Sequence, residues 1–374
     1  MSKRVHWLFV SVALSLAAAA LLFPYLAYGD GGGEQPAPIA ADADKFDEGL
    51  ARAIEDGQPD KALRYILFFE DEANLAPESL PQLEAMRRRE MVSRLQATAD
   101  QSQALVLAIL EEYKAKGEVS QYRQLWIING IAVSGTAETA RKLASHPHVA
   151  RLQLDETRYQ FDDVYSQDNF TWEQRLGGSP WGVEQIQANI VWDGLDIRGE
   201  GSTVAIVDSG VDLAHPDLST NYRGNKGDGQ LEHEKHWFHT GVVTRTEPYD
   251  VFGHGTHVAG IAVGQNGIGV APEAKWIAAA IADQYGVIYD SYVHAAFQWL
   301  LAPGGDSNAA PDVANNSWGG PSDQAKFMED IRILHQAGII TVFSAGNGGP
   351  AKGSIQSPGS YPQTIAVGAR DQMD

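Results

Sequence analysis

The 374-residue sequence contains no cysteine. Disulfide bonds, thiol nucleophiles and cysteine-ligated zinc or iron–sulfur centres are therefore excluded. Basic residues are also scarce, because 28 Lys and Arg stand against 48 Asp and Glu and leave a net charge of −20. So acidic a chain is a poor partner for nucleic acids and for anionic membranes. The hydrophobic share of 44% and the charged share of 20% are ordinary for globular proteins, and the length allows more than one folded domain.

Long hydrophobic runs are absent after the first 30 residues. At the N-terminus, Lys3 and Arg4 precede an apolar run over Trp7–Phe23, and Ala27-Tyr28-Gly29 fits a small-x-small cleavage site. This order is typical of a secretory signal peptide, so residues 1–29 predict export and a secreted, extracellular protein with no membrane attachment after cleavage. The alternative is an uncleaved N-terminal anchor, because a run of 17 residues approaches the length that spans a bilayer.

Composition and periodicity divide the rest of the chain into four parts. Residues 30–61 are rich in Gly, Pro and Ala and predict a flexible linker. Residues 62–156 show a β-α-β-α-β order, in which the middle strand region can be split in two, and this order predicts a small ferredoxin-like α+β domain. Residues 157–180 are polar and Gly-rich and indicate an exposed junction that is open to proteolytic cleavage. In residues 181–374 short apolar strands alternate with helices, which predicts an α/β domain with a mostly parallel sheet and helices on both faces.

The expected elements can be given by residue range. In the first folded part we expect strands at Leu63–Phe69, Leu125–Val133 (with a turn-like Asn129-Gly130) and Val149–Leu154, and helices at about Leu80–Lys116 and Ala137–Ser145. In the second we expect strands at Thr203–Val207, Lys275–Ile281, Val313–Ser317, Ile339–Ser344 and Thr364–Val367, and helices from about His254, at Ser291–Leu301 and at Asp323–Ala337. Ligands of such sheets bind at the carboxyl ends of the strands.

A carboxylate and an imidazole form the first candidate site. Asp208 follows the strand Thr203–Val207, and His254 comes 46 residues later in His254-Gly-Thr-His-Val-Ala-Gly260. A carboxylate at a strand end can accept the Nδ1–H of an imidazole and fix its tautomer. His254 is then a candidate general base that takes a hydroxyl proton and returns it to the leaving amine. Taken alone, Asp208-Ser-Gly210 is more typical of a simple turn.

His257 lies one helical turn after His254. Its position predicts a histidine packed within a helix. The alternative is a His-x-x-His metal pair in a metal-dependent hydrolase. No third ligand stands nearby and no His-Glu-x-x-His motif is present, which makes this a weak zinc pattern.

Asn347 follows another predicted strand, in Phe343-Ser-Ala-Gly-Asn-Gly-Gly349. A side-chain amide at a strand end is suited to donating a hydrogen bond to an oxyanion. The alternative is an ordinary turn Asn before two glycines.

Asn315-Asn-Ser-Trp-Gly-Gly320 ends a third strand. Its glycines would let a substrate backbone approach and pair as an added strand. Ser317, Trp318 and Gly319 would then form one wall of a substrate cleft. The alternative is a tight turn with Trp318 in the core.

Together these motifs resemble the subtilisin-like serine proteases, or subtilases, and within them the bacillopeptidase F-type enzymes. The match is ordered along the chain and consists of Asp208-Ser-Gly, His215-Pro-Asp-Leu218, His254-Gly-Thr-His-Val-Ala-Gly, Asn316-Ser-Trp-Gly-Gly, Ser344-Ala-Gly-Asn347, Tyr361-Pro and Ile365-Ala-Val-Gly368.

The resemblance implies a secreted endopeptidase with an Asp-His-Ser triad. Asp208 and His254 would be two triad members, Asn347 the oxyanion donor and Ser317–Gly319 the substrate-binding strand. It further implies polypeptide substrates, a monomeric enzyme and no required cofactor. Residues 62–156 resemble the inhibitory propeptide of the family (inhibitor I9-like), which chaperones folding, binds its own protease domain and is then removed by cleavage between about Thr157 and Pro180.

The third triad member departs from the family pattern. In subtilisin the nucleophilic Ser follows the catalytic His by roughly 157 residues and the oxyanion Asn by roughly 66, which would place it near ~411 to ~413. The Gly-Thr-Ser-Met-Ala motif of the family is absent, and Ser354, Ser357 and Ser360 lack its spacing and its helix-starting context. We therefore expect a catalytic domain that is truncated before the Ser and inactive as written.

Two loops also depart from the family. Asp208 and His254 are separated by 46 residues, against about 32 in subtilisin, so roughly 14 residues are inserted, which we place in a surface loop within Asn225–Tyr249. Gly264–Pro272 is short for the family's calcium loop. Asp217 matches a calcium ligand, so structural calcium is an expectation that the short loop weakens.

Two hypotheses remain for the chain as written. The first is a protease precursor with a truncated record, which resequencing past codon 374 would test. The second is a complete, non-catalytic protein that acts as a binder or inhibitor of a subtilase. Folded protein that binds a subtilase and leaves casein intact would support the second.

Overall fold

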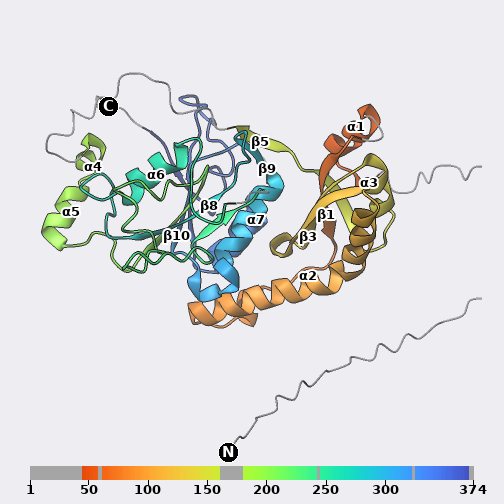
Figure 1. Cartoon of the computed structure of the whole chain (residues 1–374), viewed down its shortest axis with the longest axis horizontal. Helices are drawn as coiled ribbons and strands as arrows, with labels where there is room; N and C mark the ends of the chain where they lie inside the picture. The colour runs from red at the N-terminus through yellow and green to blue at the C-terminus, as the bar shows by residue number, and fades with distance from the viewer. Residues whose placement is uncertain (1–43, 58–60, 161–179, 242–244, 322–324, 370–374) are drawn as a thin grey trace, which may run out of the picture. The chain divides into compact units, whose positions relative to one another are not determined.

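The computed structural model describes residues 44–57, 61–160, 180–241, 245–321 and 325–369, all within one compact unit that spans residues 41–374. The predicted signal peptide and most of the predicted junction lie outside the described residues. We name residues 44–156 the N-terminal module and residues 180–369 the C-terminal module. Figure 1 shows their elements, from red to yellow in the first module and from green to blue in the second.

The N-terminal module is built on a four-stranded antiparallel sheet in the order β2-β3-β1-β4. A long helix follows β1 and a short one follows β3, which gives the βαββαβ order of the ferredoxin-like arrangement, as the sequence predicts. Its elements are β1 (Leu63–Phe69), α2 (Glu84–Ala115), β2 (Val119–Leu125), β3 (Gly130–Gly135), α3 (Ala137–Ala144) and β4 (Val149–Leu154), with short 3-10 helices η2 (Pro77–Ser79) and η3 (Trp126–Ile128).

The middle strand region is divided in two. We predicted one apolar region over Leu125–Val133, whereas β2 ends at Leu125 and β3 begins at Gly130. Between them Asn129 takes a left-handed φ of 43°, which reverses the chain after η3. Asn and Gly tolerate this conformation better than other residues, so the turn-like character of Asn129-Gly130 was correctly predicted.

Helix α1 (Glu48–Asp56) lies within residues 30–61, where we predicted a flexible linker. The side chain of Asp47 caps it by accepting a hydrogen bond from the Leu50 N–H at 2.8 Å. Leu50 and Ile54, spaced four apart, pack into the same core as β1, α2 and β4. The linker prediction missed this helix because it was based on the Gly- and Pro-rich composition of the residues that precede it.

The C-terminal module contains a six-stranded parallel sheet in the order β12-β11-β10-β6-β8-β7. Successive residues of a strand point to opposite faces. Ala205 and Val207 of β6 therefore pack with α7 and α8, and Ile206 between them packs with α6. The prediction of a parallel sheet with helices on both faces is confirmed. The elements are β6 (Thr203–Asp208), β7 (Trp237–His239), α6 (His254–Val263), β8 (Lys275–Ala280), β9 (Val287–Tyr289), α7 (Asp290–Leu301), η5 (Pro303–Gly305), η6 (Ser307–Ala309), β10 (Val313–Asn316), α8 (Met328–Gln336), β11 (Ile340–Ser344) and β12 (Ile365–Val367).

Several short elements were not predicted. Helices α4 (Trp181–Gln185) and α5 (Ala188–Leu195) precede β6, and β7 forms one edge of the sheet. Strand β5 (Thr157–Gln160) begins the range that we predicted as an exposed junction, yet it pairs antiparallel with β9 of the C-terminal module. Strands of three or four residues are too short to show a hydrophobic periodicity that identifies them in the sequence.

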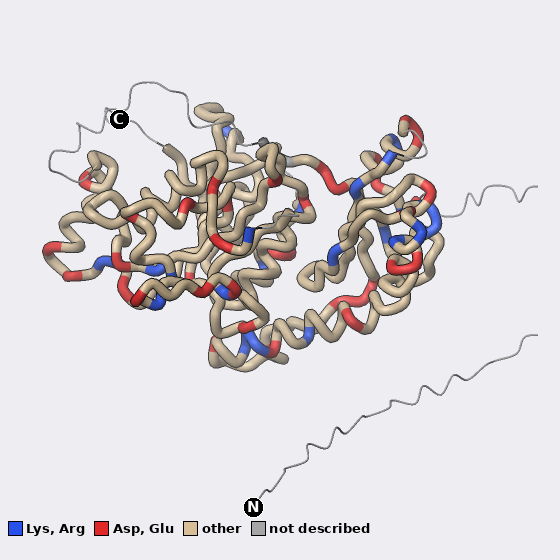
Figure 2. The backbone as a smooth tube through the Cα atoms, in the orientation of Figure 1, with Lys and Arg blue, Asp and Glu red and all other residues tan. Residues whose placement is uncertain are grey.

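Helix α2 joins the two modules. Met91, Val92 and Leu95 on one of its faces are buried in the same core as Ile331 and Leu334 of α8. Acidic and basic residues alternate along its first part (Figure 2), with Arg94 bonded to Glu90 and Arg88 bonded to Glu84. Beyond the helix, the buried Arg88 donates from Nε to the carbonyl oxygen of Ala337 at 2.9 Å and from Nη1 to that of Ser307 at 3.3 Å.

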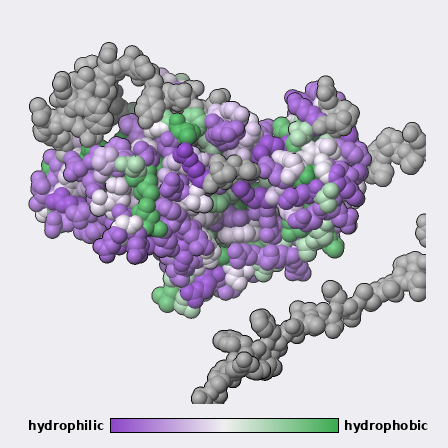
Figure 3. All heavy atoms as spheres, viewed as in Figure 1, coloured by the Kyte–Doolittle hydropathy of each residue, from purple (hydrophilic) through white to green (hydrophobic). Residues whose placement is uncertain are grey.

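The exposed surface is mainly polar, as the face in Figure 3 shows, with smaller hydrophobic patches between the hydrophilic residues. Among the residues that the structure describes, none of the helices has the length and apolar character needed to cross a membrane. The apolar run at Trp7–Phe23 is outside this part of the chain.

Candidate active site

Asp208 is the last residue of β6, in the middle of the parallel sheet. Its side chain is fully buried, and Oδ1 accepts hydrogen bonds from Nδ1 of His254 at 2.6 Å and from the Ser209 N–H at 2.7 Å. The second oxygen, Oδ2, is buried and has no hydrogen-bond partner among the described residues. The charge of this carboxylate is therefore held mainly by His254 and by the backbone at Ser209.

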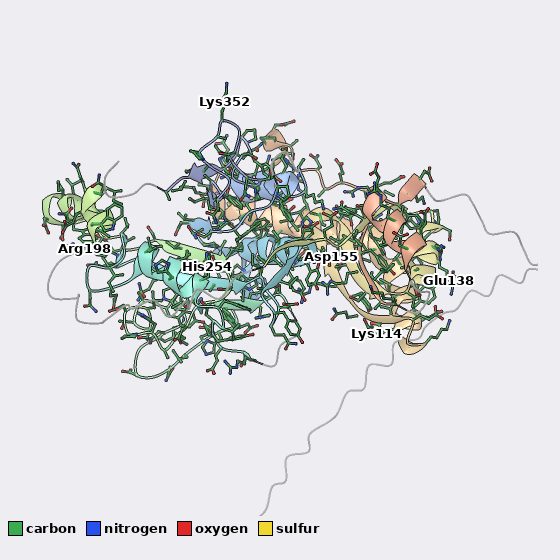
Figure 4. The ribbon with its side chains drawn as sticks, turned by 90° about the horizontal axis from the view of Figure 1, so that it is seen from above. Lys114, Glu138, Asp155, Arg198, His254 and Lys352 are labelled. Atoms are coloured by element: carbon green, nitrogen blue, oxygen red, sulfur yellow. The ribbon has the colours of Figure 1, made fainter. Side chains whose placement is uncertain are left out.

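His254 is the first residue of α6, and its ring is partly exposed, with 27% of the side chain accessible. Figure 4 shows it at the start of this helix. Because Nδ1 faces Asp208, the neutral ring carries its proton on Nδ1 and its lone pair on Nε2. This is the tautomer that a general base needs. The structure thus brings together the two residues that the sequence predicted as an acid–base pair across 46 positions.

The two groups perturb each other's proton affinity. Burial lowers the pKa of His254, but the hydrogen bond and the negative charge of Asp208, together with the charge of Asp250, outweigh it, so the pKa of His254 is raised. Burial raises the pKa of Asp208, against the opposing effects of the His254 hydrogen bond and charge. The imidazolium form of His254 is consequently stabilised in the folded chain.

The pKa shift of His254 predicts a pH dependence. A folded-state pKa above the unfolded value means that protonation stabilises the fold at pH values below about 6.5, and that this contribution is lost as the pH rises through the raised pKa. The neutral form that can accept a proton appears over the same rise. We expect an NMR titration of the His254 ring to give a pKa above 6.5 that falls in Asp208→Asn. A value at or below 6.5 in the unmodified chain would contradict the pairing.

Two glycines allow Asp208 and His254, which we call the dyad, to approach each other. Gly210 has a φ of 128°, a backbone conformation that residues other than glycine rarely adopt. A Cβ on Gly255 would lie 2.0 Å from the carbonyl oxygen of Gly210 and 3.0 Å from the Cβ of Asp208. The first turn of α6 therefore presses directly on the turn after β6, and this contact sets the distance between Asp208 and His254.

Asp250 holds both halves of the dyad in place, and sequence reasoning missed it. Its Oδ1 accepts from Ser209 Oγ and from the N–H groups of Phe252 and Gly253, and its Oδ2 accepts from the N–H and the hydroxyl of Thr256. Ser209 Oγ in turn accepts from the Gly255 N–H at 2.9 Å. The available signal was an Asp just before a helix start, which is typical of capping.

The predicted substrate-binding strand lies at the same edge of the sheet. Asn316, the last residue of β10, is level with Val207 of β6, so the chain after Asn316 leaves the sheet at the edge that carries Asp208. The side chain of Trp318 is 2% exposed, and its Nε1 donates to the carbonyl oxygen of Val207 at 3.0 Å. Trp318 is therefore a core residue, and the substrate-binding role of Ser317–Gly319 stays a prediction.

Asn347 lies in the exposed loop that follows β11. Because β11 is parallel to β10, with Phe343 level with Asn316, this loop leaves the sheet at the edge that carries Asp208. The structure thus places Asn347 at the predicted edge with its side chain accessible. Its role as an oxyanion donor stays a prediction.

The predicted metal ligands do not gather. Asp217 is buried, and its Oδ1 accepts a hydrogen bond from Nδ2 of Asn266 at 2.7 Å. His257 is exposed, so its predicted packing within the helix was wrong. In the described part of the chain, no three acidic, His or Cys side chains converge on a metal position. Calcium at Asp217 stays an untested prediction.

Known proteins are similar to this chain in sequence. Residues 199–374 match the family model described as "Subtilase family". Bacillopeptidase F of Bacillus subtilis (strain 168) is 38% identical over 316 residues, which are 78% of this chain and 22% of the relative. Subtilisin amylosacchariticus of Bacillus subtilis subsp. amylosacchariticus is 30% identical over 254 residues, which are 66% of this chain and 57% of the relative.

The chain therefore spans about a fifth of the first relative and little more than half of the second. The likeness to bacillopeptidase F confirms the resemblance drawn from the motifs. The Asp208–His254 pair lies inside the matched range, on a parallel sheet with helices on both faces. The match to the subtilase family thus covers residues 199–374 of this chain, the part that holds the Asp208–His254 pair.

Proposed function

We propose that this chain is part of a secreted serine endopeptidase precursor that hydrolyses peptide bonds in polypeptides. The observation that carries the proposal is the 2.6 Å contact between Nδ1 of His254 and the buried carboxylate of Asp208 at the carboxyl edge of the sheet. His254 would act as the general base and Asp208 would fix its tautomer and stabilise the imidazolium. Asn347 would donate to the oxyanion, and the backbone of Ser317–Gly319 would bind the substrate.

The nucleophile of this reaction is a serine that we place in a segment after residue 374. The motivation is that the family's Gly-Thr-Ser-Met-Ala motif is absent from the sequence, while the Asp and His members of the triad are paired. Export through a signal peptide and a monomeric enzyme remain part of the proposal. Calcium is not required for any step of it.

The experiment uses the complete open reading frame that contains these 374 codons. We expect its secreted product to hydrolyse casein and to react with a serine-directed phosphonate, and we expect both activities to disappear in His254→Ala. A complete product that carries no Gly-Thr-Ser motif, or that is folded and processed but unreactive, would contradict the proposal. It would favour the alternative of a non-catalytic binder or inhibitor, which binding to an active subtilase would then establish.

We further propose that the N-terminal module is the inhibitory propeptide. Two contacts support this role. Strand β5 adds to β9 of the C-terminal module as an extended peptide would, and Arg88 of α2 bonds to the carbonyl oxygens at Ala337 and Ser307. The module would occupy the protease until cleavage in the stretch after β5.

Arg88→Ala tests this role. Losing charge-assisted hydrogen bonds to buried carbonyl groups costs about 1.5–3 kcal/mol for each. Since about 1.4 kcal/mol corresponds to a factor of ten, we expect the inhibitory module to bind its protease domain about a hundredfold more weakly. The measurement is the Ki of the cleaved module against the mature enzyme. Arg89→Ala is the matched control, because Arg89 is the next residue of the same helix and is exposed. Equal Ki values for the two variants would contradict the proposed docking.

A further inference from the structure

Strand β5 shows how an extended peptide lies on the C-terminal module. Thr157 is level with Tyr289 of β9, and Gln160 is level with Val287. Backbone pairing of this kind holds many sequences, and the side chains beside the added strand supply the specificity. The residues that flank β5 therefore report which side chains this face of the molecule recognises.

The backbone contact continues upstream of β5. The Asp290 N–H donates to the carbonyl oxygen of Glu156 at 3.1 Å, so Glu156 extends the paired segment by one residue. Asp155, which Figure 4 labels, accepts from the N–H and the hydroxyl of Ser291 at 2.8 and 2.7 Å. Glu156 is thus held in a fixed position next to the start of α7.

The side chain of Glu156 meets a lysine of the C-terminal module. Nζ of Lys326 donates to Oε2 of Glu156 at 2.5 Å and to Oδ2 of Asp290 at 2.9 Å. Asp290 is fully buried, whereas the side chains of Lys326 and Glu156 are 21% and 39% exposed. The buried carboxylate of Asp290 therefore holds the ammonium of Lys326 from the protein interior. An ammonium has three N–H bonds. Those that do not reach Asp290 can donate to a carboxylate on the solvent side, which in this structure is that of Glu156.

We propose that Lys326 is a specificity-determining residue of the protease, a subsite for an acidic side chain in the extended peptide. Once the N-terminal module has left, Lys326 takes the carboxylate of a substrate residue at the position that Glu156 occupies here. Asp290 positions the ammonium without competing for this outer place. A lysine or arginine at that substrate position would place two cations together and is disfavoured. This inference rests on the proposed function, because the substrate is the peptide that the protease cleaves.

The first experiment uses the chain as it stands and does not depend on activity. Hydrogen exchange at the amides of residues 157–160 reports how firmly β5 is held. We expect exchange about three- to tenfold faster in Glu156→Gln, and at least as fast in Lys326→Met, which also removes the contact with Asp290. Adding Glu156→Gln to Lys326→Met should cause no additional change, because the Lys326–Glu156 contact is already lost. Lys326→Arg should stay close to the unmodified chain. Lys352→Met is the matched control, since Lys352 is exposed and points away from the modules in Figure 4. Additive effects of the two substitutions would overturn the proposal.

The second experiment uses the mature product of the complete reading frame. Synthetic peptides with the sequence of residues 153–160, carrying Glu, Gln or Lys at position 156, compete with casein hydrolysis. The expected Ki is lowest for Glu, about three- to tenfold higher for Gln and higher again for Lys, and Lys326→Met should abolish this order. Equal Ki values with intact hydrolysis would overturn the inference alone. Absence of hydrolysis in every preparation would overturn both the proposed function and the substrate preference. The hydrogen-exchange experiment would still show whether Lys326 recognises the carboxylate of Glu156.

Discussion

Replacing Asp208 by asparagine in the complete gene product is expected to lower kcat about 10⁴-fold while KM changes little. The amide keeps the size of the carboxylate but can donate a hydrogen to Nδ1 of His254. The ring proton then moves to Nε2, and the nitrogen that should accept a proton from the nucleophile no longer can. The measurement is kcat on a peptide substrate, with circular dichroism to confirm that the variant is folded.

The matched control for Asp208→Asn is Asp212→Asn, which makes the same chemical change four positions later. Asp212 is exposed, and its Oδ1 accepts a hydrogen bond from the Ala214 N–H. We expect this control to keep kcat within a factor of about two, as surface substitutions usually do. A kcat of Asp208→Asn within tenfold of the unmodified enzyme would show that Asp208 does not fix the tautomer of His254.

Gly255→Ala is expected to destabilise the fold even though alanine is the better helix former. In the interior of a helix the exchange would favour the folded state by about 0.5–1 kcal/mol. Here the added Cβ would lie 2.0 Å from the carbonyl oxygen of Gly210, which is backbone and cannot turn aside. Overpacking costs about 1–3 kcal/mol when the neighbours have to shift. We therefore expect the free energy of unfolding to fall by about 1–3 kcal/mol, measured by urea denaturation.

A second result separates this clash from a loss of stability elsewhere. Because α6 has to move away from the turn at Gly210, His254 moves away from Asp208, and its raised pKa should fall toward 6.5. Gly260→Ala is the control on the same helix, since a Cβ there would meet no atom within 4 Å. An unchanged or increased stability in Gly255→Ala would show that the contact between α6 and the Gly210 turn is looser than the structure indicates.

Long elements and ordered motifs were predictable from the sequence alone. Strands β1 and β4 have the predicted bounds, and the helices α2 and α7 begin and end within a few residues of the prediction. These segments combine clear periodicity with recognisable stops, and local pattern is most reliable where it is longest. The pairing of Asp208 with His254 was predictable because a strand end and a helix start fix the directions of both side chains.

The rest depends on contacts between segments far apart in sequence. Strands β5 and β9 are short, and each is stabilised by the other rather than by its own pattern. The link from Asp250 to Asp208 could not be predicted, because Ser209, the donor to Asp250 that is distant in sequence, reaches it only when the turn after β6 meets the start of α6. Lys326 is likewise an unremarkable lysine until the chain brings Asp290 and Glu156 beside it.

The pairing of β5 with β9 has a consequence that concerns concentration. As long as β5 is joined to the C-terminal module through residues 161–179, its effective concentration at β9 is on the order of millimolar. Contacts of modest individual strength, such as the partly exposed Lys326–Glu156 pair, are then sufficient to keep the site occupied. A single cut in the connecting stretch turns the same contacts into an ordinary bimolecular equilibrium. If the chain is exported as proposed, dilution would then favour release of the segment without any change in the structure of the site.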